Sequence, residues 1–117
     1  MGVHRITATE MPHDRSAIDT GGFTATVGEF DAPEGHGDWH HHGDHHIVAY
    51  IASGNVRVES GADGNAVTEA GPGDLVHIDP GTVHRETYSG KMKVVGFGIG
   101  SGPGVVKVDG PDASSPS

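Results

Sequence analysis

Short apolar runs of strand length, separated by turn residues, dominate the hydrophobic pattern of this chain. Residues 23–27 alternate apolar and polar positions, as a strand with one buried face does, and residues 56–59 alternate again. Residues 47–52 form a continuous apolar run of the same length. Further strands are predicted at 66–70, 75–78, 83–88, 91–99 and 105–108.

Turn signals separate these runs about every 8 to 12 residues, and no segment is a convincing helix. Asp63-Gly64 is a dipeptide typical of tight hairpins, and Pro72-Gly73 and Pro80-Gly81 mark two further turns. This pattern predicts an all-β domain, built as an antiparallel sandwich or barrel. We expect the barrel at residues 21–109, after an N-terminal arm at 1–20 and before a disordered tail at 110–117.

Composition agrees with this architecture and limits the size of the core. The 117 residues include 20 glycines and 7 prolines, and only 33% of the chain is hydrophobic. So small a core predicts additional support from barrel closure, a metal or a partner subunit. We expect a homodimer, with residues 105–108 and the N-terminal arm contributing to the interface.

Charge and cysteine content exclude several classes of function. The formal net charge is -9 with only 7 Lys and Arg, so neither nucleic acid nor an anionic membrane surface is an expected partner. The chain has no cysteine, which excludes disulfides, thiolate-bound zinc and iron–sulfur clusters. No apolar stretch approaches the roughly 18 residues of a membrane helix, and no signal-peptide pattern is present. We expect a cytoplasmic protein.

The most informative residues are histidines in two segments. Residues 39–46 read Trp-His-His-His-Gly-Asp-His-His, and His84 follows the Pro80-Gly81 turn in the second segment. Alternate residues of a strand share a face, so His40 and His42 can point at one metal ion if this segment is extended. The alternative is that this histidine-rich run binds metal adventitiously as an exposed loop.

Together the two segments resemble the paired motifs of the cupins, small double-stranded β-helix proteins of the jelly-roll type. The first cupin motif is His-x-His, then Glu after three or four residues, then Gly. It resembles His40-x-His42, His46 and Gly54 here. The second motif, Gly followed by Pro-x-Gly-x-x-His and Asn, resembles Gly73, 79–81, His84 and Tyr88, with Asp79 and Tyr88 departing from it.

The resemblance implies a metal site made of His40, His42, His46 and His84. If the spacing after His42 is counted as four rather than three, the third position falls on Ile47, which is no ligand. His45 competes with His46 for the same place. An all-imidazole site suits iron, nickel, copper or zinc, and the sequence does not choose among them.

The resemblance also implies function. We expect a metal-dependent enzyme acting on a small molecule, with a dioxygenase-like activity on an enol, diketone or phenolic substrate. The alternatives are a Lewis-acid isomerase, cyclase or lyase, and a cupin that only binds a small molecule. The catalytic candidates near the metal are Tyr88, Glu86 and His77.

Overall fold

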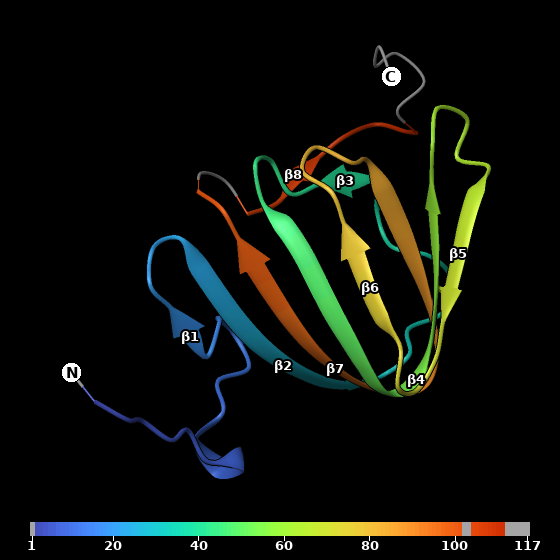
Figure 1. The fold of residues 1–117 in the computed structure, drawn as a ribbon. Helices are drawn as coiled ribbons and strands as arrows, with labels where there is room; N and C mark the ends of the chain where they lie inside the picture. Colours follow the sequence, from blue (N-terminus) through green and yellow to red (C-terminus); the bar gives the residue numbers. More distant parts are fainter. Residues whose placement is uncertain (1, 102–103, 112–117) are drawn as a thin grey trace.

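The computed structural model describes residues 2–101 and 104–111, and this part of the chain is built almost entirely from β-strands (Figure 1). One 3-10 turn, Ala8–Glu10, lies in the N-terminal segment, which extends away from the barrel. The strands are β1 (Ile18–Asp19), β2 (Phe23–Asp31), β3 (His40–His41), β4 (His46–Ser60), β5 (Ala66–Ala70), β6 (Leu75–Ile78), β7 (His84–Ile99) and β8 (Val106–Lys107).

Two long antiparallel strands, β4 and β7, run through the whole domain. Residues 46–51 pair with residues 94–99, and residues 55–60 pair with residues 84–89. The register shifts between these two stretches, on either side of Ser53. Irregularities of this kind bend a strand pair, so both strands turn together and each contributes to two walls (Figure 1).

The remaining strands extend these two walls. On the first wall, β2 pairs with the second half of β7, β1 pairs with β2, and β6 pairs with the first half of β4. On the second wall, β5 pairs with the second half of β4, while β3 pairs with the start of β7 and with β8. The sheet therefore curls around a central space, as Figure 1 shows.

Alternate side chains of each strand fill this space, and in β4 the inward-facing positions change once from odd-numbered to even-numbered residues. Ile47, Ala49 and Ile51 face inward from the first half of β4, and Val56 and Val58 face inward from the second half. The switch from odd to even positions occurs at the register shift around Ser53. The buried core cluster consists of Ile51, Val56, Val58, Ala70 and Met92.

Gly54 makes the bend possible. Its φ of 81° lies in the left-handed region, which residues with a side chain rarely adopt. A Cβ at this position would overlap the Sδ of Met92 and would lie 3.0 Å from the carbonyl oxygen of Lys91. Both the backbone angle and the close approach of β7 therefore require glycine here.

The structure confirms the predicted all-β architecture and refines its elements. The runs expected at 47–52 and 56–59 are one strand, β4, and those expected at 83–88 and 91–99 are one strand, β7. The short strand β1 lies in the segment expected as the N-terminal arm, and β3 lies in the histidine segment that we expected to be extended. Residues 112–117 of the tail that we predicted to be disordered lie outside the described residues. No helix in the described part of the chain is long and apolar enough to span a membrane.

We expect alanine to destabilise the protein at Gly54 but not at Gly22. Replacing Gly54 by Ala should lower the free energy of unfolding by about 2 to 4 kcal/mol, because it adds left-handed strain to overlap with Met92. Gly22→Ala is the matched control, since its Cβ would meet nothing within 4 Å. Urea unfolding followed by Trp39 fluorescence measures both variants. Equal stability of the two would contradict the role assigned to Gly54.

Candidate metal centre

Three histidines from distant parts of the chain meet at one end of the barrel. His40 lies in β3, His42 follows that strand, and His84 begins β7. His40 and His84 are register partners, and one ring nitrogen of each of the three histidines lies within 4.8 Å of the others. The ring centroids of His40 and His84 are 4.3 Å apart. The sequence prediction that His40, His42 and His84 come together is met by this geometry.

The backbone fixes the orientation of all three rings. Each Nδ1 lies within hydrogen-bond distance of a carbonyl oxygen, which only accepts, so Nδ1 carries the proton in each neutral ring. Each Nε2 is then left with a free lone pair, as in histidines that bind metals. The carbonyls belong to Asp38 for His40 (2.8 Å), Gly104 for His42 (2.7 Å) and Thr82 for His84 (2.8 Å).

His84 is the most enclosed of the three, and its Nε2 lacks a hydrogen-bond partner among the described residues. The residue is 0% exposed, and Nε2 is buried without a hydrogen-bond partner in the described structure. Oε1 of Glu86 lies 2.8 Å from this nitrogen and 3.6 Å from Nε2 of His40, but the first contact lacks hydrogen-bond geometry. A lone pair this close to a carboxylate oxygen requires a cation, either a proton on the ring or a metal ion.

The pKa shifts of Glu86 and His84 also indicate that a cation is stabilised between them. Burial opposes the charged form of Glu86, but contact with His84, His40 and Tyr88 outweighs burial and lowers the pKa of its carboxyl. Burial likewise opposes protonation of His84, but the Glu86 carboxylate and the Thr82 carbonyl raise its pKa. Burial, together with the neighbouring His84 and His40, lowers the pKa of His42. The site therefore combines an ionised carboxylate with rings that can be neutral donors.

Two of these histidines, His40 and His42, line a cavity of about 380 Å³ between the two walls. Glu86 and Tyr88 also line it, and Tyr88 donates a hydrogen bond from its hydroxyl to Oε2 of Glu86 at 3.2 Å. Burial, followed by the charge of Glu86, raises the pKa of Tyr88, so the hydroxyl stays protonated. The aliphatic lining consists of Ile47, Ala49, Ile51, Val56, Val58, Val76, Ile78 and Val94.

The donor set fits a divalent transition metal. Three neutral imidazole nitrogens and one nearby carboxylate oxygen are the donors that zinc, iron, nickel and copper accept. The unpartnered Nε2 of His84 and the backbone bonds at each Nδ1 both match what a ligated histidine requires. Glu86 could supply the fourth donor from β7.

The structure does not bring His46, which we expected as the fourth ligand, to the other three histidines. His46 is exposed, and it clusters with His77 and Asp79 rather than with the other three histidines. The reason is strand alternation, because Ile47 faces the cavity and its neighbour therefore faces outward. His45, the competing candidate, donates from its ring to the carbonyl of His42 at 3.0 Å and belongs to neither cluster of the described residues.

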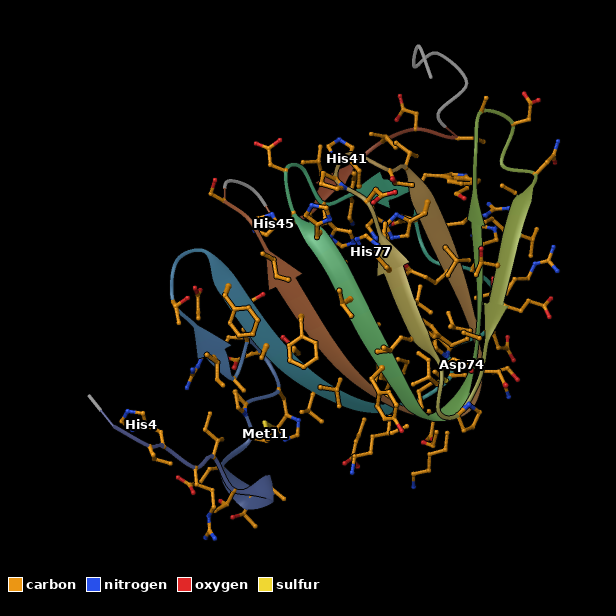
Figure 2. All side chains as sticks on the ribbon, in the orientation of Figure 1. His4, Met11, His41, His45, Asp74 and His77 are labelled. Carbon is orange, nitrogen blue, oxygen red and sulfur yellow. The ribbon has the colours of Figure 1, made fainter. Side chains whose placement is uncertain are left out.

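The three catalytic candidates are placed differently. Glu86 and Tyr88 both line the cavity beside the histidines. His77 is exposed and lies outside this cavity, because Val76 and Ile78 take the inward positions of β6. Figure 2 shows His77 at the same end of the barrel as His41 and His45. The sequence signal for Glu86 was its spacing of two from His84, which places both on one face of β7.

Comparison with known proteins places this architecture in a family. The family model described as the cupin domain matches residues 28–97. This chain belongs to the cupin family. The match covers the last four residues of β2, all of β3 to β6, and β7 up to Phe97, and it includes His40, His42 and His84. No curated protein matches the chain significantly.

Solved structures share the fold of this cupin at low sequence identity. Streptomyces PAC13, solved as tyrosine-to-phenylalanine variants with uridine, has 15% identity and a TM-score of 0.72, with 100% of each chain covered. A double-stranded β-helix protein from Klebsiella pneumoniae has 19% identity and a TM-score of 0.67, covering 88% of this chain and 89% of its own. KdgF from Halomonas has 20% identity and a TM-score of 0.61, covering 75% and 79%.

The ligand assignment predicts the effect of single substitutions on metal binding. Replacing His40, His42 or His84 by Ala should weaken the tightest zinc site of the untagged protein by more than about 100-fold, because a direct donor is lost. His41→Ala is the control, since its ring accepts a hydrogen bond from the Gly43 amide and lies outside the cluster. Zinc titration against a chelating dye measures the affinity. If His41→Ala emptied the site while His84→Ala retained it, the histidine run would be binding metal as a loop.

Proposed function

We propose that this cupin is a metal-dependent enzyme that removes a proton next to a carbonyl group of a small substrate. The observation that carries this proposal is the position of Glu86, whose Oε1 lies 2.8 Å from His84 and 3.6 Å from His40 in a largely apolar cavity. A carboxylate beside a metal site is placed to accept a proton from a substrate that the metal binds.

The substrate class follows from the shape and lining of the cavity. At about 380 Å³ it belongs to the smaller ligand cavities, which span roughly 300 to 1,000 Å³. Glu86 and Tyr88 lie beside the histidines, and aliphatic side chains make up most of the remaining lining. The proposed substrate has a carbonyl or enol oxygen at one end and a compact, mainly apolar body. PAC13 was solved with uridine, so at least one protein of this fold takes a small organic ligand.

His40, His42 and His84 would hold the metal, which would supply Lewis-acid polarisation of a substrate carbonyl. Glu86 is the proton acceptor in this scheme, since its lowered pKa keeps it ionised at neutral pH. The Tyr88 hydroxyl holds Oε2 through its hydrogen bond, which leaves Oε1 directed at the histidines. The aliphatic walls exclude water, which strengthens these electrostatic interactions. Isomerisation, cyclisation and elimination can all start from this proton transfer.

A dioxygenase-like activity is the second candidate, and a specific feature favours it. Two histidines and one carboxylate around an open position form the donor set of non-haem iron oxygenases. His40, His84 and Glu86 supply such a set, with His42 as an additional nitrogen donor. In this case Glu86 would be a ligand and not a base.

Proton exchange separates the two candidates. Metal-loaded protein should exchange the α-protons of a cognate 1,2- or 1,3-dicarbonyl for deuterium in D₂O, as seen by NMR, without consuming oxygen. Glu86→Gln should slow this exchange by about 100-fold or more while the metal is retained, because the proton acceptor is lost. Glu29→Gln, an exposed carboxylate paired with Lys93, is the control.

Two other outcomes would contradict the proposed proton transfer. Oxygen uptake with the same panel, together with loss of metal from Glu86→Gln, would establish the dioxygenase alternative. Tight binding without exchange or oxygen uptake would contradict both enzymatic candidates and leave a cupin that only binds its ligand.

A further inference from the structure

A second group of metal-binding side chains lies on the outer face of the barrel. His46 at the start of β4, His77 in β6 and Asp79 just after β6 each offer a ligand atom within 4.8 Å of the others. Nδ1 of His46 is 3.0 Å from Nε2 of His77, and this Nε2 is 3.6 Å from Oδ1 of Asp79. All three side chains are exposed to solvent.

The strand pairing that forms the first wall also assembles this group. Ile47 pairs with Ile78 and Val48 pairs with His77, so His46 and Asp79 are opposed at the next step of the same ladder. Ile47 and Ile78 face the cavity, which directs the flanking side chains to the outside. Two neighbouring strands thus hold the three residues, whereas a histidine-rich loop would leave them unrestrained.

We propose that His46, His77 and Asp79 form a second site, for a divalent transition metal ion of the zinc, nickel or copper class. Nitrogens bound to one such ion at about 2.1 Å lie roughly 3.0 to 3.4 Å apart, close to the 3.0 Å found between His46 and His77. The two rings are also nearly parallel, with an interplanar angle of 21° and centroids 5.2 Å apart. Water would complete the coordination of an exposed ion held by three protein ligands.

Metal binding changes the tautomer of one ring. A hydrogen bond between the two nitrogens uses the single N–H proton of one neutral imidazole, and when both nitrogens bind a metal this proton moves to the other nitrogen of the same ring. Asp79 adds a negative charge that an imidazole pair alone would lack. This feature separates the outer group from two histidines that only share a proton.

The outer site adjoins both segments that carry the cavity histidines. His46 directly follows the turn after His42, and Asp79 opens the turn that leads to His84. The two turns contact each other, because the amide of Gly81 donates to the carbonyl of Gly43 at 2.8 Å. An ion on the outer face would therefore tie together the two segments that position the inner ligands, and should raise the melting temperature of the protein.

Zinc titration of the untagged protein by calorimetry tests the proposal. The wild type should bind two zinc ions, and His46→Gln and His77→Gln should each weaken the second binding event at least tenfold while leaving the first intact. Glutamine at 77 can still hydrogen-bond to His46, so this variant separates metal ligation from the hydrogen bond. His13→Gln, an exposed histidine of the N-terminal segment, is the matched control and should bind two ions.

The two sites can be distinguished in the same experiment. His84→Ala should remove the inner ion and keep the outer one, since His46, His77 and Asp79 are untouched. A single wild-type ion that is lost in His77→Gln but kept in His84→Ala would support the outer site and contradict the proposed function. Two ions bound unchanged by both glutamine variants, or one ion that only His84→Ala removes, would overturn the outer site. Circular dichroism of the metal-free variants checks that each one is folded.

Discussion

The pairing of β4 with β7, and its bend at Gly54, is the constraint on which the rest of this structure depends. The pair closes at one end with His46 opposite Ile99 and at the other end with Ser60 opposite His84. Because the pair folds back at its middle, both of these ends come to the same end of the barrel (Figure 1). The first residue of β7 is thus brought to the end where β3 presents His40, and the cluster of histidines is a consequence of how the two strands bend.

Beside the three histidines, the carboxylate of Glu86 requires a compensating positive charge. An ionised carboxylate in a largely apolar cavity is costly unless a positive charge lies beside it. The hydrogen bonds from each Nδ1 to a backbone carbonyl turn the three Nε2 atoms inward as acceptors, so neutral rings do not supply that charge. A proton on His84 or a bound metal ion does supply it. A metal ion bound at this position would therefore compete with that proton.

Strand alternation explains what could be predicted from the sequence and what could not. The apolar runs and turn signals located most strands, and the two histidine segments identified His40, His42 and His84. Local patterns did not show that 47–52 and 56–59 belong to one strand, because the bend between them lies in the pairing of β4 with β7, which is distant in sequence. The carbonyls of Asp38, Thr82 and Gly104 could not be predicted either, since backbone contacts leave no signature in residue type.

The outward position of His46, which we expected as a ligand of the inner group, follows from the same rule. Counting residues from His42 gives a position in the motif, but the face of a strand is decided by which neighbour enters the core. Ile47 enters it, so a donor at position 46 faces solvent and meets His77 and Asp79. The cavity still receives a carboxylate, because β7 runs beside β4 and directs Glu86 into the same space. In this chain the acidic side chain beside the histidines therefore comes from β7, and position 46 of β4 contributes to the outer face instead.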